Sequence, residues 1–389
     1  MKKHLKILAS YLTAAMSFSM FSGAHAALLN VDGTPTPNIV AGDGSVTPDA
    51  PVVPAGLFGG VTSIYIETDA GGFICTGSAI SKRHIVTAAH CIDSASDVGQ
   101  VIDITQPGFR VRTVFTDGGV LNAIIDSEAL NIHPDYHGFA KCEAGEFGGL
   151  SGACLNDDIA VITLSEDIPD GIEIYDFVRD PSVITHGTLF TMVGHGTTGN
   201  GLTGSIPNSS DFFTKRIGFN FAEIFDCDES TGGSYLGPIG CDLEEGSQAE
   251  VWWADYDGII PDVNGDINID VLCTLFTIGC GNGLGDDFAD LFEAGIAGGD
   301  SGGPSFIYDA VQGKFLLAAN NTFGNGSFAT VPNGYGNLFG GNLYAPYLDW
   351  IDTNFLLPLA ARDVPAPAVL GLLMMGLSLV AMRRYKRTA

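Results

Sequence analysis

Short apolar runs separated by glycine-rich turns are the feature that most restricts the fold of this chain. Runs of apolar or β-branched residues occupy 61–68, 73–80, 84–87, 111–115, 159–164, 188–193 and 314–319. Glycine and serine interrupt them, which is typical of strands joined by tight turns. No sustained helical period appears before residues 344–355, which we expect to form one closing helix. The pattern predicts an all-β protein, either a barrel or a sandwich.

The first residues are typical of an export signal. Three lysines precede an apolar stretch over residues 7–21, and alanines at positions 24 and 26 supply the small residues that a signal peptidase reads. We therefore expect a signal peptide at residues 1–26. A membrane helix is the alternative, but serines interrupt the stretch and no stop-transfer pattern follows. Residues 27–55, rich in Pro, Gly, Asp and Thr, are expected to form a linker or pro-segment.

The C-terminus has the composition of a second processing signal. After a linker at 358–363, a Pro-Ala-Pro motif precedes an apolar run over residues 368–382, and four basic residues follow it. Residues 364–389 resemble the PEP-CTERM sorting signal of exported proteins, on which a membrane enzyme of the exosortase type acts. Ala366 stands where that signal usually has glutamate. A plain membrane anchor is the alternative, because the apolar run is just long enough to span a membrane. The protein is expected to be secreted or held at the cell surface, with a precursor that is transiently anchored.

The charge of the chain excludes one class of partner. Residues 27–363 contain all 45 acidic residues but only 10 of the 17 basic residues. Such a surface repels phosphate backbones, so we expect no nucleic-acid binding. Solubility in a salty medium explains the acidity, and calcium binding is the other interpretation.

The cysteines fit an oxidising compartment, because there are eight and the chain carries an export signal. They fall in couples that are adjacent in sequence, and short local loops make this the simplest of many connectivities. The expected pairs are Cys75 with Cys91, Cys142 with Cys154, Cys227 with Cys241, and Cys273 with Cys280. Zinc binding is the alternative, but the clustered Cys-x-x-Cys spacing of zinc sites is absent.

Two segments, near 137–156 and 225–297, have the composition of insertions. Both are rich in Gly, Asp and Cys, and we expect them to border the site and select substrates. The second contains alternating oxygen-bearing side chains that could surround a structural calcium ion. They are Asp262, Asn264, Asp266 and Asp270. Ile267 and Cys273 replace the glycine and glutamate of an EF-hand loop, so an acidic surface turn is the alternative.

Three motifs present a serine, a histidine and an aspartate. Ser301 lies in Gly-Asp-Ser-Gly-Gly-Pro, His90 in Thr-Ala-Ala-His-Cys, and Asp158 in Asp-Ile-Ala-Val. A serine hydroxyl needs a base within hydrogen-bond reach, and the base needs an orienting group. Glycines beside Ser301 permit a tight turn whose N–H groups converge, so those of Gly299 and Ser301 are candidates to bind an oxyanion. The Gly-x-Ser-x-Gly pattern also fits the nucleophile elbow of α/β-hydrolases, but those run Ser, acid, His, whereas this chain runs His, Asp, Ser.

With these motifs in this order, residues 58–356 resemble the trypsin/chymotrypsin-like serine proteases. The His-Pro-Asp-Tyr run at 133–136 and the Gly-His-Gly of 194–196 occupy places where that family has similar segments. The resemblance implies two six-stranded antiparallel β-barrels with a C-terminal helix, in a protease domain at 56–357. It implies that Ser301 attacks a peptide carbonyl, that His90 transfers the proton, and that Asp158 orients His90. No cofactor is required for this chemistry.

The resemblance also places a specificity pocket and an activation pair. Counting back from Ser301 puts Gly295 at the pocket floor, where cleavage after Lys or Arg needs aspartate, and Ala297 lacks the cysteine that usually braces this pocket. The substrate-binding strand is expected at Thr322, Phe323 and Gly324. These residues predict cleavage after apolar residues.

Family members commonly mature by cleavage, after which the new N-terminus pairs with the aspartate before the serine. Ile39 is the nearest candidate N-terminus and Asp300 its expected partner, although Ile39 follows asparagine rather than a basic residue. A plain linker at this position is the alternative.

The sequence therefore predicts a secreted or surface-anchored serine endopeptidase acting on protein or peptide substrates. A catalytically silent matrix-binding protein on the same scaffold is the alternative from another class, and an esterase is an alternative within the enzymes.

Overall fold

The computed structural model describes most of the chain between the two termini. The described residues are 39–41, 52–94, 100–142, 154–227, 234–235, 241–242, 248–260, 263, 267–277 and 293–357. The expected signal peptide at 1–26, most of the linker at 27–55, and the C-terminal segment from residue 358 onward lie outside them. The chain divides into two units, residues 1–346 and 347–389, which are described separately.

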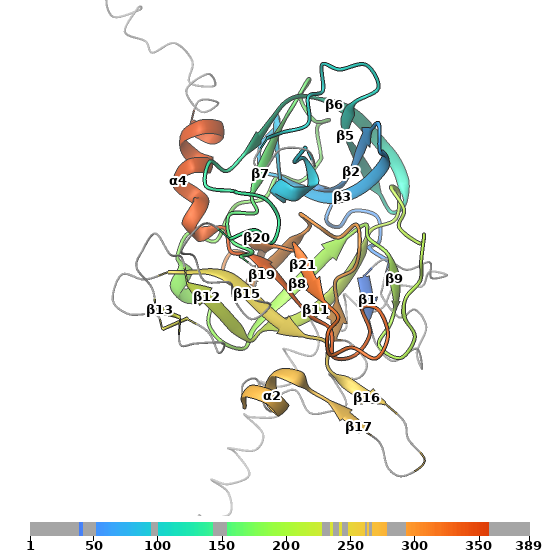
Figure 1. The fold of residues 1–389 in the computed structure, drawn as a ribbon. Helices are drawn as coiled ribbons and strands as arrows, with labels where there is room; N and C mark the ends of the chain where they lie inside the picture. The colour runs from blue at the N-terminus through green and yellow to red at the C-terminus, as the bar shows by residue number, and fades with distance from the viewer. Residues whose placement is uncertain are drawn as a thin grey trace, which may run out of the picture. The chain divides into compact units, whose positions relative to one another are not determined.

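A closed six-stranded antiparallel barrel forms the first half of the larger unit (Figure 1). Its strands are β2 (Val61–Thr68), β3 (Gly71–Ala79), β4 (His84–Thr87), β5 (Arg110–Asp117), β6 (Val120–Ile132) and β7 (Ala160–Leu164). They close in the order β2-β3-β4-β7-β6-β5. Inward-facing apolar residues such as Ile64, Ile85, Phe115 and Ile162 are fully buried in one cluster. This alternation is what a barrel filled by its own side chains requires, so the first barrel is confirmed.

The second half contains three four-stranded sheets, so the second six-stranded barrel stays a prediction. The sheet orders are β10-β9-β1-β18, β11-β8-β19-β20 and β12-β15-β22-β21. Their strands are β1 (Ile39–Ala41), β8 (Thr188–Gly194), β9 (Thr198–Asn200), β10 (Gly204–Ser205), β11 (Arg216–Ala222), β12 (Ile224–Cys227), β15 (Ala249–Asp255), β18 (Ala294–Gly295), β19 (Pro304–Asp309), β20 (Lys314–Asn320), β21 (Phe323–Asn325) and β22 (Leu338–Asn342). All the pairings are antiparallel except that of β1 with β9, which is parallel.

The segment expected to be an insertion at 225–297 contains part of this core. Trp252 and Trp253 lie on β15, both are fully buried, and β15 pairs with β12 and β22. Trp252 packs edge-on against Phe190, with ring centroids 4.9 Å apart. Smaller elements of the segment form a separate hairpin, β16 (Gly258–Ile260) with β17 (Ile267–Ile269), and the helix α2 (Val271–Phe276) (Figure 1). The first residues of α2, Val271 and Leu272, are buried against Trp253. The expected insertion bounds stay a prediction, and the described part of this segment contributes β15 to the core.

The described part of the second unit is helical. It comprises α4 (Leu348–Ile351) and a wider turn over Asp352–Leu356, preceded by a short turn of helix at Ala345–Tyr347. This agrees with the helix expected at 344–355. Among the described residues, no helix has the length and apolar character needed to cross a membrane.

Candidate active site

Strand pairing in the first barrel brings His90 and Asp158 together. β4 pairs with β7 so that Thr87 lies opposite Ala160. Residues just after β4 and just before β7 therefore meet at one end of the barrel. His90 lies in a single turn of helix, η1 (Ala89–Cys91), which begins two residues after β4.

Two hydrogen bonds fix this pair. His90 Nδ1 lies 2.6 Å from Asp158 Oδ2, and the backbone N–H of His90 donates to Asp158 Oδ1 at 2.8 Å. The Asp158 side chain is 2% exposed and that of His90 is 20% exposed. An ionised carboxylate only accepts hydrogen bonds, so Nδ1 carries the proton and Nε2 of the neutral ring is left as the acceptor. The side-chain amide of Asn320 also donates to the backbone carbonyl of Asp158, at 3.0 Å.

The surroundings of His90 stabilise the protonated, positively charged form of its imidazole ring. Burial lowers the pKa of His90, but the charge of Asp158 and its hydrogen bond raise the pKa, and the net pKa lies above the usual 6.5. A neighbouring carboxylate that stabilises an imidazolium is what a general base needs during proton transfer.

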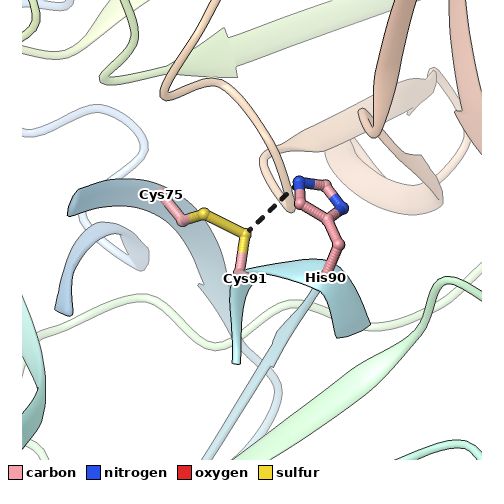
Figure 2. Close-up of side chains that lie close together, drawn as sticks. All are labelled: Cys75, His90 and Cys91. Atoms are coloured by element: carbon pink, nitrogen blue, oxygen red, sulfur yellow. Dashed lines mark hydrogen bonds between the residues drawn. A yellow bond between two sulfur atoms is a disulfide. The ribbon is translucent and has the colours of Figure 1, made fainter. Parts of the chain in front are cut away.

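A disulfide bond fastens the helical turn that carries His90. Cys75 on β3 is bonded to Cys91, the residue after His90 (Figure 2). The Cys91 sulfur lies 3.9 Å from His90 Nε2 and 3.6 Å from the carbonyl oxygen of Ser301. The disulfide is therefore in contact with both the histidine and the serine.

Ser301 lies in a glycine turn between β18 and β19. The backbone φ angles of Gly299 and Gly302 are +104° and +77°, a region that residues with a Cβ rarely adopt. A Cβ on Gly302 would lie 2.0 Å from Thr87 Oγ1. The turn is held against the first barrel because the N–H of Thr76 donates to the carbonyl of Ser301 at 2.8 Å. The motif glycines therefore allow this close approach of the two halves.

Ser301 and His90 line the same cavity, of about 840 Å³. Ser301 is half-buried, and its contacts among the described residues run through its carbonyl oxygen, with none joining the hydroxyl to the His90 ring. Such hydrogen bonds are often long before substrate binds. The N–H groups of Asp300 and Gly302 donate to backbone carbonyls, whereas those of Gly299 and Ser301 donate to none of the described residues.

The Gly-His-Gly segment makes room for Asp300. Asp300 is fully buried and accepts hydrogen bonds from the N–H groups of Gly196 and Ala297, at 2.8 and 2.9 Å. Burial raises the pKa of Asp300 to about 7, against the effect of these bonds and of Arg216. A Cβ on Gly194 would lie 2.0 Å from Asp300 Oδ1.

A Cβ on Gly196 would likewise lie 2.6 Å from the Asp300 carboxyl group. Both glycines are thus required by the buried carboxylate. The histidine between them is buried, which lowers the pKa of His195 to about 3, so its ring is neutral.

One of the residues expected to form the specificity pocket, Gly295, lies beside a buried tyrosine. Gly295 on β18 has Tyr256 beside it, and a Cβ on Gly295 would lie 3.4 Å from that ring. Tyr256 is fully buried and packs on Tyr335 with ring centroids 4.9 Å apart. Thr322 and Phe323 are also buried, and Gly324 is exposed at β21. None of the four expected pocket residues lines the cavity of His90 and Ser301.

The expected activation pair is described only in part. β1 carries Ile39 and lies between β9 and β18, with Val40 opposite Gly295. The side chain of Ile39 lies outside the described residues. β1 is nevertheless paired with the strand that leads into the serine turn.

One residue of the site was missed by the sequence analysis. The ring of Phe139, which is 41% exposed, lies 4.7 Å from the His90 ring at an angle of 49°. Phe139 belongs to the segment expected to be the first insertion, and it lies three residues before the loop that the Cys142–Cys154 disulfide bond closes. No local pattern in the sequence marks this contact.

The remaining candidate residues are placed less completely. Cys227 and Cys273 are also disulfide-bonded. Of their expected partners, Cys280 lies outside the described residues and only the backbone of Cys241 is described. Of the expected calcium ligands, Asp262, Asn264 and Asp266 lie outside the described residues, and Asp270 instead caps α2 by accepting the N–H of Cys273 at 2.8 Å.

Comparison with known proteins agrees with this geometry. Residues 53–210 match the family described as Trypsin, and the match includes His90 and Asp158 but ends before Ser301. The chain is 32% identical over 101 residues to the venom serine protease Bi-VSP of Bombus ignitus, covering 26% of this chain and 22% of that protein. It is 30% identical over 147 residues to trypsin alpha-4 of Lucilia cuprina, covering 38% of this chain and 48% of that protein.

The chain thus spans about a fifth and about half of the lengths of these two relatives. The structure of HL collagenase is also similar, with a TM-score of 0.42 and 17% identity, over 79% of this chain and 97% of that one. The sequence matches thus show that residues 53–210, which contain the closed barrel and the Cys75–Cys91 disulfide bond, are similar to the Trypsin family and to serine proteases.

Proposed function

We propose that this protein is a serine endopeptidase that cleaves peptide bonds through an acyl-enzyme intermediate. Ser301 is the nucleophile, His90 the general base and acid, and Asp158 the group that orients His90. One observation carries the proposal. His90, which is hydrogen-bonded to Asp158, lines the same cavity as Ser301, although the serine is 143 residues beyond the aspartate in sequence.

The chemistry follows from the protonation of the pair. Ser301 Oγ attacks the peptide carbonyl carbon while His90 Nε2 takes the hydroxyl proton. Asp158 stabilises the imidazolium that forms, and the N–H groups of Gly299 and Ser301 stabilise the oxyanion. His90 then gives the proton to the leaving amine, and a water molecule repeats the sequence to release the acid. Protein and peptide substrates are inferred from the same family.

Hydrolysis of a peptide library tests this proposal. Residues 27–363 are expected to cleave the library, whereas Ser301→Ala and His90→Ala are expected to lose about three to six orders of magnitude in kcat/KM. Cleavage that survives Ser301→Ala would contradict the assignment. Hydrolysis of simple esters without peptides would favour the esterase, and absence of both activities in matured protein would favour the matrix-binding scaffold.

For specificity, we propose cleavage after apolar residues. The supporting observations are the glycine at position 295 and the aromatic surroundings that Tyr256 and Tyr335 provide beside it. An acidic pocket floor is needed to hold Lys or Arg, and Gly295 cannot supply it. A cleavage profile dominated by Lys or Arg would refute this preference.

For activation, we propose that cleavage before Ile39 creates an N-terminus that pairs with Asp300. The pairing of β1 with β18, and the burial of the Asp300 carboxylate, support this. N-terminal sequencing of active protein is expected to begin at Ile39, and any other start would contradict it.

For location, we propose export through the N-terminal signal and sorting of the C-terminal tail by a membrane enzyme. The disulfide bonds support an oxidising compartment. Mass spectrometry of the protein from its own cells is expected to find neither residues 1–26 nor the basic C-terminus. Recovery of the intact C-terminus at the envelope would favour the plain anchor.

A further inference from the structure

Three acidic side chains converge at one end of the second half. Glu223 precedes β12, Asp255 ends β15, and Asp257 follows it. One carboxylate oxygen from each lies within 4.8 Å of one from each of the others. Glu223 and Asp255 are 3% and 0% exposed, and Asp257 is only partly exposed. We call these three residues the acidic triplet.

Buried oxygens of the acidic triplet lack partners. Asp255 Oδ2 accepts the N–H groups of Val271 and Leu272, at 2.6 and 2.9 Å. Asp255 Oδ1 and Asp257 Oδ1 are buried and have no hydrogen-bond partner among the described residues. A buried carboxylate oxygen without a partner carries a large desolvation cost. The site thus has free acceptor capacity where water is excluded.

The surrounding sequence provides no compensating positive charge. Between Arg216 and Lys314 the chain contains no lysine, arginine or histidine, but it contains 19 acidic residues. The two flanking cations are engaged elsewhere, since the Arg216 charge interacts with Asp211 and Asp300, and Lys314 pairs with Asp176.

A fourth carboxylate, Glu293, adds to the negative charge. It accepts the N–H of Asp257 at 3.2 Å. Burial and the neighbouring carboxylates raise the pKa of Asp257 and of Glu293 well above the usual range.

We propose that Glu223, Asp255 and Asp257 bind a divalent cation, and that the cation is Ca²⁺. Carboxylate oxygens are hard ligands, which excludes the metals that prefer sulfur or imidazole. Three carboxylates binding through one or two oxygens, with water on the partly exposed side of Asp257, satisfy the six to eight ligands of Ca²⁺. Mg²⁺ demands a more regular octahedron and retains its waters.

The cation site is connected to the proposed active site. Asp257 is hydrogen-bonded to Glu293, which directly precedes β18 and therefore Gly295 and the serine turn. Asp255 also holds the first turn of α2. A bound cation would thus stabilise the start of the segment that leads to Ser301.

Terbium luminescence and thermal unfolding test the proposal. We would use the full chain carrying Ser301→Ala, treated with a chelator, so that self-cleavage and the proposed protease activity play no part. Tb³⁺ is expected to show luminescence sensitised by the aromatic residues of β15, Ca²⁺ to displace it, and millimolar Ca²⁺ to raise the unfolding temperature. Absence of both signals would overturn the proposal and favour a triplet that is neutralised by protons.

Two variants and two controls locate the site. Glu223→Gln and Asp257→Asn are each expected to weaken Ca²⁺ binding at least tenfold, while unfolding at the same or a higher temperature in chelator because a like charge is removed. Asp167→Asn, in the first half, and Asp266→Asn, in the calcium loop expected from the sequence, are expected to leave the affinity unchanged. Binding lost in Asp266→Asn but retained in both triplet variants would overturn the assignment.

Discussion

Removing the disulfide bond between Cys75 and Cys91 gives a prediction whose size follows from the chain connectivity. The two cysteines are 16 residues apart in sequence. The entropy of closing a loop of that length in the unfolded chain corresponds to about 3 kcal/mol at 25 °C. Both residues are 6% exposed. The double replacement Cys75→Ala, Cys91→Ala therefore removes two buried sulfur atoms, and solvent does not fill the space they leave, which adds a small loss of packing energy. We expect the free energy of unfolding to fall by about 3 kcal/mol.

Urea unfolding in the Ser301→Ala background measures this change without self-cleavage. The matched control is Cys142→Ala, Cys154→Ala, whose cysteines are 12 residues apart, and the same relation gives about 3 kcal/mol. The two variants should therefore be destabilised almost equally. In protein that retains Ser301, their effects on kcat should differ, because only Cys91 adjoins His90 and contacts Ser301. A loss below about 1 kcal/mol for Cys75→Ala, Cys91→Ala, or a larger loss of kcat in the control, would refute the reasoning.

The remaining predictions concern Asp300 and the histidine. Gly196→Ala would place a Cβ 2.6 Å from the Asp300 carboxyl group, so it should cost about 1–3 kcal/mol of stability, whereas Gly298→Ala, with no atom within 4 Å of its Cβ, should be nearly neutral in urea unfolding. In a pH–rate profile, kcat/KM should rise with pH through the pKa of His90, above 6.5, because only the neutral ring accepts the serine proton. Asp158→Asn should lower the pH at which kcat/KM rises and reduce kcat by about 10⁴-fold. A rise at an unchanged pH would contradict the conclusion that the charge of Asp158 raises the pKa of His90. Because folding raises the pKa of His90, the protonated ring stabilises the fold below about pH 6.5, and this contribution should be lost as pH rises through the folded pKa.

Local sequence patterns predict the strands whose residues are mostly buried. The expected strand at 61–68 coincides with β2, and that at 84–87 with β4. β6 gave no such pattern because most of its side chains are exposed or half-exposed. The buried Trp252 and Trp253 were assigned to an insertion because glycine, aspartate and cysteine surround them in sequence. Their place on β15 is determined by pairing with strands distant in sequence.

In the candidate site, too, residues that lie in local motifs could be predicted from the sequence, whereas contacts between distant parts of the chain could not. Motif spacing predicted that Ser301, His90 and Asp158 act together, because each lies in a short segment with its own requirements for turns and glycines. The structure brings His90 to Asp158 and places His90 and Ser301 at one cavity, and their catalytic role stays a prediction. Phe139 contacts His90 from a residue 49 positions further along the chain, and Glu223 approaches Asp255 from the connection between β11 and β12, so no local pattern signals either contact. The space beside Gly295, the expected pocket floor, is likewise filled by Tyr256, which lies 39 residues earlier in the chain.

Covalent labelling tests the central claim most directly. Matured wild-type protein should react with a fluorophosphonate probe, and peptide mass spectrometry should place the adduct on Ser301. His90→Ala should label far more slowly, and Ser301→Ala should not label at all. An adduct on another residue, labelling that persists in Ser301→Ala, or no labelling of protein with a verified mature N-terminus would contradict the assignment of Ser301 as the nucleophile.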